Sequence, residues 1–343
     1  MRPTQCVPLF LFAVSVSFFC GCGKGNESVA ARPDAQPSDP PPDHIVAKVN
    51  GTPLTWAEME RRAMGYLKDD VEVNHLVIPS NRMDEAKEYF RRRSINAFVF
   101  KTVMMDEAIK KGIRLTETDR QQGLNSLARS LKARNWTTND FFQKGPQGPE
   151  MMRREFEDGT IIDKLLAVHV RNTLKIDDKE IEDAISLINA TNGIKRAKLE
   201  DIRKQLLAGA DFAEVARTVS ECPSAKKEGD LGEFPRGKML KEFEDAAFSQ
   251  AIGEIGKVIE TRFGYHIIKV TAHTEAKAAT ASTPALPETV RASHILLKKV
   301  AVDRKRITDT ILRAKYNKGV EQYFAELKSK ARIECFLYKD MTF

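Results

Sequence analysis

The spacing of apolar residues changes near Ile194, and this change limits the folds that the chain can adopt. Between Trp56 and Asn189 apolar residues recur mostly at helical spacing, whereas from Ile194 to Val270 glycine-rich loops alternate with short β-prone runs. A single helical bundle or a single sheet is therefore excluded. With 343 residues, of which 42% are hydrophobic, the chain can bury two cores, and we predict an α+β fold with two domains.

Cysteine and charge exclude two further classes of protein. Three of the five cysteines lie within the first 22 residues, so the chain cannot be a disulfide scaffold and must be held by packing. Lysine and arginine number 55 against 48 aspartate and glutamate residues, a net charge of +7. Because the two signs are interleaved along most of the chain, nucleic acid is not expected as its main partner.

The first 22 residues have the features of an export signal. Arg2 precedes the apolar run Val7–Phe19, which is too short to span a bilayer as a helix. The small Gly21 directly before Cys22 resembles the lipobox of bacterial lipoproteins, in which the thiol receives a diacylglycerol. We therefore expect a signal peptide at residues 1–21, a lipid anchor at Cys22, and an envelope protein that faces the periplasm. Secretory cleavage without a lipid and an uncleaved anchor are the alternatives.

A helical domain is predicted between a disordered tether and the change in pattern. The tether, residues 22–44, is rich in Pro, Ser and Asp, and the domain spans residues 45–193. It begins with a β-prone run and with a capping box formed by Thr55 and Glu58. Its sequence shows no cluster of candidate catalytic residues, which indicates a structural or peptide-cradling role. Its main helices are predicted at Met83–Ile113, Thr116–Lys132, Met151–Leu174 and Asp177–Ile188.

Four motifs follow one another between residues 203 and 271. They are a helix-turn-helix junction at Leu206–Ala216, a loop and Gly-Asp-Leu-Gly strand at Ser220–Phe234, a helix at Gly237–Phe248, and closing strands at Gly253–Ile255 and Phe263–Val270. In this order and spacing they resemble the parvulin (PpiC, rotamase) family of peptidyl-prolyl cis-trans isomerases. The resemblance implies a small domain, residues 194–299, with a four-stranded antiparallel sheet flanked by helices. It implies no cofactor and no metal.

The first strand of that family is displaced in this sequence. The family begins with a strand like Ala-Ser-His-Ile-Leu, but none precedes the helix predicted at Arg196–Leu207, and the pattern stands instead at residues 291–298. The domain therefore resembles a circularly permuted parvulin with a linker at residues 271–289. Twenty-one residues separate Val270 from Ala292, a reach of about 70 Å at roughly 3.3 Å per residue, while a return beside one strand needs about 20 Å.

The resemblance also implies the site residues. Leu231, Met239 and Phe243 match the positions that grip the proline ring, and Met239 and Phe243 are expected on one helix face. Phe263 is expected to wall the pocket. Cys222 matches the position beside the prolyl bond, with an electrostatic rather than a nucleophilic role. His266 and His294 match two histidines of the central strands that hydrogen-bond each other. Without the resemblance, these residues would be interpreted as ordinary core residues.

Several alternative functions remain open at this stage. In the first alternative, the domain has no isomerase activity and the protein is a holdase that only binds unfolded polypeptides. A basic stretch after the histidine strand could bind phosphate or simply begin a solvated helix; its residues are Lys298, Lys299, Arg304, Lys305 and Arg306. A metal site at His266, His273, His294 and Cys222 would lack zinc-site spacing.

The C-terminal region, residues 300–343, is predicted to form a helix and a strand that return to the N-terminal domain. This layout resembles that of exported foldases of the SurA/PrsA kind, which flank a parvulin domain with a helical chaperone body. The resemblance implies that the partners are unfolded or proline-containing exported polypeptides, together with a membrane reached through the lipid. The sequence does not indicate the oligomeric state.

Overall fold

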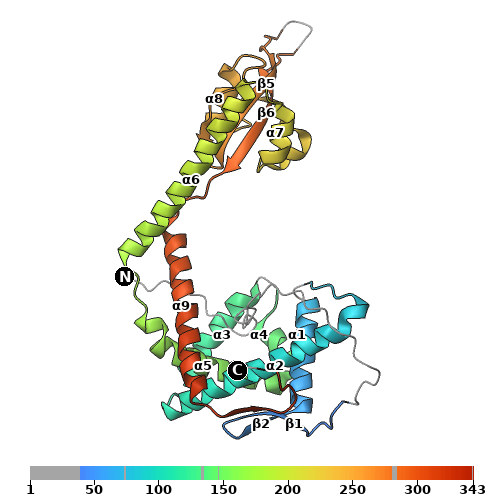
Figure 1. The fold of residues 1–343 in the computed structure, drawn as a ribbon, viewed down its shortest axis with the longest axis vertical. Coiled ribbons are helices and arrows are strands. Elements are labelled where there is room, and N and C mark those ends of the chain that lie inside the picture. Colours follow the sequence, from blue (N-terminus) through green and yellow to red (C-terminus); the bar gives the residue numbers. More distant parts are fainter. Residues whose placement is uncertain (1–38, 73–74, 133–134, 146, 280–283, 342) are drawn as a thin grey trace. The chain divides into compact units, whose positions relative to one another are not determined.

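The computed structural model describes residues 39–72, 75–132, 135–145, 147–279, 284–341 and 343. The predicted signal peptide, the lipidation site Cys22 and most of the predicted tether lie outside these residues. The chain divides into two compact units (Figure 1). Unit 1 combines the described residues up to Lys175 with Leu312–Phe343, and unit 2 is Ile176–Ile311. Among the described residues, no helix is both long enough and apolar enough to cross a bilayer.

A four-stranded antiparallel sheet forms the centre of unit 2, in the order β3-β6-β5-β4. Of these four strands, β6 comes last in the sequence, but it lies in the interior of the sheet and pairs with both β3 and β5. The strand that carries the His294 pattern thus returns beside β5, as the calculated reach of the chain after Val270 allows. The strands are β3 (Asp230–Pro235), β4 (Ile259–Thr261), β5 (Gly264–Thr274) and β6 (Thr289–Lys298), and the helices are α6 (Asp178–Leu207), α7 (Phe212–Val219), η5 (Pro223–Lys227) and α8 (Lys241–Ser249).

Alternation along β5 and β6 gives the sheet two apolar faces. On one face Ile267 and Ile295 pack with side chains of α6 and α7. On the other face Ile268 packs with side chains of α8, among them Phe243 and Phe248. Both faces are therefore covered, and polar side chains that point into either face are removed from water.

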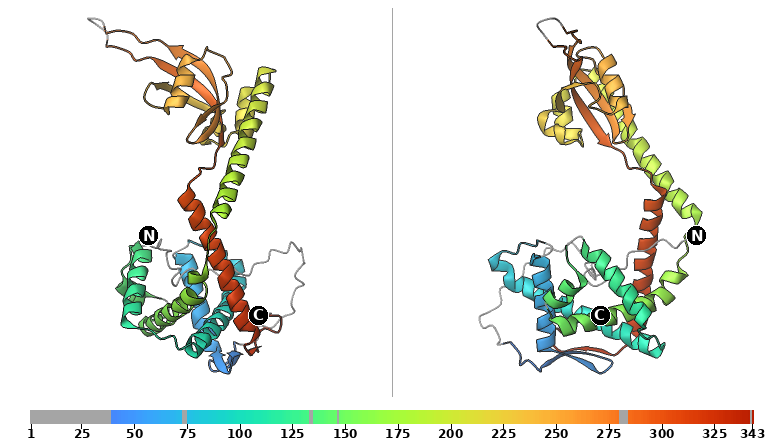
Figure 2. Two further views of the ribbon diagram at one scale, coloured as in Figure 1. Left: turned by 90° about the vertical axis from the view of Figure 1, so that its left-hand side faces the viewer. Right: turned by 180° about the vertical axis from the view of Figure 1, so that it is seen from behind.

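Three features of unit 2 differ from the sequence predictions. One continuous helix, α6, replaces two predicted helices, so residues 176–193 belong to unit 2 instead of the helical domain. Asn192, a buried residue within α6, forms two hydrogen bonds with the backbone of Val300. This tertiary contact overrides the weak helix propensity around Gly193. The predicted linker is paired near its two ends: Thr274 lies opposite Thr289, and a further bridge joins Lys277 and Leu286. The two strands continue as an arm beyond the rest of the sheet (Figure 2).

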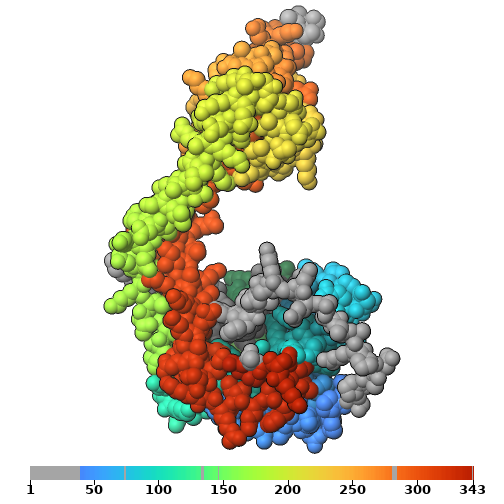
Figure 3. Space-filling view, in the orientation of Figure 1, coloured from blue at the N-terminus to red at the C-terminus, as the bar shows by residue number. Residues whose placement is uncertain are grey.

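Unit 1 is a helical body with a three-stranded sheet in the order β2-β1-β7. The C-terminal strand β7 pairs with β1, with Ile333 opposite Val49, so these two strands are neighbours although they are far apart in the sequence (Figure 3). A helix that the sequence analysis did not predict, α4, begins at the capping box of Thr137 and Asp140. The elements are β1 (Ile45–Val49), β2 (Thr52–Thr55), α1 (Trp56–Glu72), η2 (Ser80–Arg82), α2 (Met83–Lys110), α3 (Glu117–Leu131), α4 (Thr138–Lys144), α5 (Pro149–His169), η4 (Arg171–Thr173), α9 (Arg304–Ser329) and β7 (Ile333–Cys335).

Candidate active site

Two buried histidines face each other across β5 and β6. Ile268 is the register partner of His294, so His266 lies two register pairs further along, on the same face of the sheet. The two Nδ1 atoms are 3.2 Å apart. The rings stack with centroids 5.4 Å apart and an interplanar angle of 23°, and both side chains are almost fully buried. The late strand therefore brings together two histidines that are far apart in the sequence.

The histidine pair belongs to a chain of four hydrogen-bonding side chains. Thr261 Oγ1 lies 2.8 Å from His266 Nε2, and Ser224 Oγ lies 3.1 Å from His294 Nε2. A bond between two Nδ1 atoms requires one donor and one acceptor, so both rings cannot be charged at once. Thr261 Oγ1 also accepts the Phe263 N–H at 3.1 Å, which favours donation of its own hydrogen to His266. In that arrangement His266 donates to His294, and His294 donates to Ser224.

Burial keeps both imidazoles neutral. It lowers the pKa of His266 to about 4, with the neighbouring His294 contributing in the same direction, and it lowers the pKa of His294 to about 4. At neutral pH the site therefore holds polar groups without a net charge.

Apolar side chains surround the histidine pair. The Phe243 ring meets both imidazoles edge-on, with centroids 5.5 Å from His266 and 5.6 Å from His294. Leu231 and Met239 are half-buried and pack against the cluster that contains Phe243. Met239, however, precedes α8, which begins at Lys241, so the prediction that it shares a helix face with Phe243 is wrong. The turn before the helix places its side chain in the same cluster.

The segment that carries Cys222 runs along the edge of β6. Cys222 is half-buried and immediately precedes the short helix η5, whose Ser224 bonds His294. Behind this helix, Gly229 accepts the His294 N–H at 2.9 Å. Its φ is +78°, and a Cβ there would lie 2.4 Å from the His294 carbonyl oxygen. Only glycine allows this close approach, which connects the Cys222 segment to the histidine strand.

Two predicted residues lie apart from the buried cluster, and two contributors to the site were missed. Phe263 is 55% exposed in the turn between β4 and β5, with the Arg262 guanidinium 5.0 Å from its ring centroid. His273 binds Glu288 at 2.7 Å instead of joining the other histidines. Thr261 and Ser224 were not predicted. The only sequence signals for them were their hydroxyl groups and their positions, five residues before His266 for Thr261 and two residues after Cys222 for Ser224.

Two of the basic residues considered for phosphate binding form ion pairs with acidic side chains. Lys299 binds Glu260 at 2.6 Å, and Arg304 binds Asp178 at 2.9 Å and also Glu182. Within the described part of the chain, no group of three His, Cys, Asp or Glu side chains is placed to hold a metal ion.

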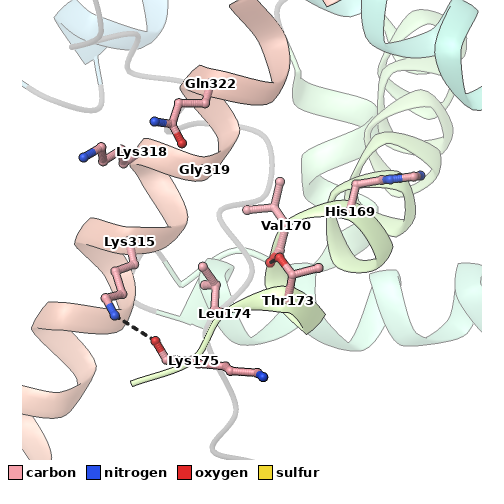
Figure 4. Close-up of a pocket in the computed structure, with 9 residues that line it drawn as sticks. All are labelled: His169, Val170, Thr173, Leu174, Lys175, Lys315, Lys318, Gly319 and Gln322. Atoms are coloured by element: carbon pink, nitrogen blue, oxygen red, sulfur yellow. Dashed lines mark hydrogen bonds between the residues drawn. The ribbon is translucent and has the colours of Figure 1, made fainter. Parts of the chain in front are cut away.

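A separate cavity of about 480 Å³ lies in unit 1 (Figure 4). Side chains of α9, such as Lys318, and of residues 169–175 line it, and Lys315 Nζ donates to the Lys175 carbonyl at 2.8 Å. None of the predicted site residues lies in this cavity.

Comparisons with known proteins connect unit 2 with one enzyme family. Residues 185–272 match the family model described as "Rotamase: PPIC-type PPIASE domain", a match that ends before β6. The chain is 40% identical over 109 residues to the peptidyl-prolyl cis-trans isomerase Pin1 of Arabidopsis thaliana, covering 32% of this chain and 91% of that protein.

The alignments with two further relatives, a foldase and a chaperone, are longer than this domain. The foldase protein PrsA of Caldanaerobacter subterraneus subsp. tengcongensis is 26% identical over 307 residues, which cover 85% of this chain and 87% of the relative. The chaperone SurA of Burkholderia lata is 34% identical over 154 residues, 43% of this chain and 32% of that protein.

Proposed function

The chain belongs to the parvulin-type peptidyl-prolyl cis-trans isomerases and combines this activity with the function of a folding chaperone, and we propose that His266 and His294 mark its active site. The observation that carries the proposal is the pair of buried, neutral imidazoles beneath the ring of Phe243. Neutral hydrogen-bonding groups in apolar surroundings suit a reaction in which no charge is transferred.

The chemistry of the substrate explains why such surroundings accelerate the reaction. A peptide bond before proline is planar because of amide resonance, and its rotation barrier is about 18 to 20 kcal/mol. Resonance places partial negative charge on the carbonyl oxygen, and the twisted transition state loses part of it. An apolar, water-poor pocket therefore favours the twisted state over the planar one. No covalent intermediate is required.

Within this proposal, each predicted residue has a stated part. Leu231, Met239 and Phe243 hold the proline ring. Cys222 lies beside the prolyl bond and adjusts the local polarity, while the hydrogen-bonded chain from Thr261 to Ser224 fixes both imidazoles in position. Phe263, exposed in its turn, contacts the polypeptide that flanks the proline.

The substrates are unphosphorylated polypeptides. A phosphate-reading site needs cations that are free to face the substrate. Of the five basic residues considered for phosphate binding, Lys299 and Arg304 are instead neutralised, by Glu260 and by Asp178 with Glu182 respectively. The helical unit 1 would hold unfolded segments of the same clients while unit 2 acts on their prolyl bonds.

We further propose that the protein is exported and lipid-anchored at Cys22, on the periplasmic face of the bacterial envelope. The support is the short apolar run followed by Gly21 and Cys22. Expression with labelled fatty acid should mark the wild-type chain and the Cys20→Ser variant, but not Cys22→Ser. Label on Cys22→Ser would overturn the assignment of the anchor.

A protease-coupled assay on Xaa-Pro tetrapeptides tests the active site. Met239→Ala and His294→Ala should each lower kcat/KM at least ten-fold. Met239→Ala loses a contact to the proline ring, and His294→Ala loses one imidazole of the pair. His273→Ala is the matched control, because this histidine binds Glu288 outside the pair. If all variants and the wild type show only the uncatalysed rate while aggregation of an unfolded client is still suppressed, the domain is a holdase.

A further inference from the structure

The two residues before Cys222 occupy an edge of β6 that β3 leaves unpaired. β3 pairs with β6 only from Thr289 to Ser293. Further along the same strand, Leu296 N–H donates to Ser220 Oγ at 3.1 Å, and the Leu296 carbonyl accepts the Glu221 N–H at 2.7 Å. The Ser220 and Glu221 pair thus serves as a short substitute strand beside the histidine strand.

The carboxylate of Glu221 extends this contact to the end of β6. It accepts the Lys298 N–H at 2.7 Å. Lys195 of α6 lies 3.2 Å from both carboxylate oxygens and donates to the Lys298 carbonyl at 2.8 Å. Burial opposes ionisation of Glu221, but the Lys298 N–H bond and Lys195 outweigh it and lower the pKa of the carboxyl group. One charged carboxylate thus joins α6, the Cys222 segment and the end of β6.

These contacts bear directly on the proposed active site. Along one short stretch of chain, Glu221 bonds Lys298, Ser220 bonds Leu296, and Ser224 bonds His294. Cys222 lies between these fixed points, and among the contacts of the described residues its side chain forms none of these bonds. Its place relative to His294 is therefore set by its neighbours. A misplacement of about 1 Å at a catalytic group can lower a rate 100-fold.

We propose that Glu221 is a positioning residue of the isomerase: by holding the Lys298 N–H and Lys195, it fixes Cys222 in register with the histidine strand. The proposal rests on the proposed function, because it matters for catalysis only if Cys222 lies beside the prolyl bond. In this role Glu221 touches neither the substrate nor an imidazole, and it acts through the ion pair with Lys195 and the bond to the Lys298 N–H.

The test compares Glu221→Ala with Glu221→Gln in the full-length chain. The glutamine can still accept the Lys298 N–H but cannot form the ion pair, so it should lose less than three-fold in kcat/KM, whereas alanine should lose about ten-fold. Glu214→Ala is the matched control, because Glu214 also forms an ion pair, but an exposed one with Arg217 within α7. This variant should stay within two-fold of the wild type.

A second readout separates positioning from general loss of structure. The alkylation rate of Cys222 by iodoacetamide, followed by peptide mass spectrometry, should change at least three-fold in Glu221→Ala and remain unchanged in Glu214→Ala. Wild-type activity in a folded Glu221→Ala variant would overturn the proposal, as would reduced activity with an unchanged alkylation rate. An inactive wild type would instead refute the proposed isomerase function, and the alkylation rates alone would then decide whether Glu221 fixes Cys222.

Discussion

The Nδ1 atoms of His266 and His294 lie 3.2 Å apart, although 28 positions separate these residues in the sequence. Their contact depends on the return of the chain from β5 to β6 through the long hairpin arm. The two strands form ten register pairs, from Gly264 with Lys298 to Thr274 with Thr289. The geometry of the histidine pair is thus a property of the hairpin and its register.

Activity should be nearly constant between pH 8 and pH 6 and should fall as the pH approaches 4. In this range the imidazoles, whose pKa values are about 4, remain neutral until the acid limit. A pH profile of kcat/KM with an uncharged tetrapeptide checks this expectation. A midpoint near the ordinary histidine pKa of 6.5 would contradict the burial-based account.

Stability should decrease over the same acid range. Because the folded-state pKa lies below the unfolded value of 6.5, the unfolded chain binds more protons between pH 6.5 and 4. The unfolding free energy should therefore fall as the pH falls through this window, by roughly 3 kcal/mol per histidine at most. Urea unfolding of the wild type and of His266→Asn/His294→Asn isolates the effect, since the variant lacks both groups. Equal pH dependence in both chains would contradict it.

Thr261→Val should lower kcat/KM about five-fold. Valine keeps the shape of threonine but removes the hydroxyl that contacts His266 Nε2, so a buried ring nitrogen loses its partner at a cost of roughly 1 to 3 kcal/mol. Thr271→Val provides the comparison, because that hydroxyl binds the exposed Arg291 carbonyl on the same sheet. Assay and thermal unfolding of both variants give the result; equal activity in the two would exclude a role for the hydroxyl.

Gly229→Ala should destabilise unit 2 and abolish activity, while Gly232→Ala should not. Both glycines have positive φ values, +78° and +72°, so both variants carry similar backbone strain. Only at Gly229 would the new Cβ meet the His294 carbonyl oxygen, whereas at Gly232 no atom lies within 4 Å. Hydrogen exchange at the β6 amides and the isomerase assay compare the two. Similar losses in both variants would indicate strain alone.

Phe243→Leu should lower kcat/KM about ten-fold, and Phe248→Leu should leave it within two-fold. Both phenylalanines are buried on α8 in one cluster, so each replacement should cost a similar amount of stability, about 1 kcal/mol. Only Phe243 contacts both imidazoles. Equal kinetic effects would show that the ring contributes packing and nothing more.

Several parts of this structure could be predicted from the sequence because each depended on a local rule. The number of residues after Val270 allowed the strand that carries His294 to return to the sheet. The helix predicted at Thr116–Lys132 is α3, which spans Glu117–Leu131, so its ends differ by one residue each.

The parts that were missed depend on contacts between distant segments. Asn192 supports a continuous α6 only because Val300 supplies two backbone partners, and no propensity indicates this. Ser224 and Thr261 acquire their importance from strand register, which brings them to opposite ends of the histidine pair. The capping box at Thr137 was a local signal that the sequence analysis overlooked.

The interior position of β6 also determines when the isomerase can take shape during synthesis. Every other strand of the sheet leaves the ribosome earlier, and β3 and β5 then expose unpaired edges where β6 will later insert. A nascent chain in this state is open to strand pairing with other chains. Until β6 is made, the nascent protein therefore exposes unpaired strand edges of the kind that unfolded polypeptides also expose.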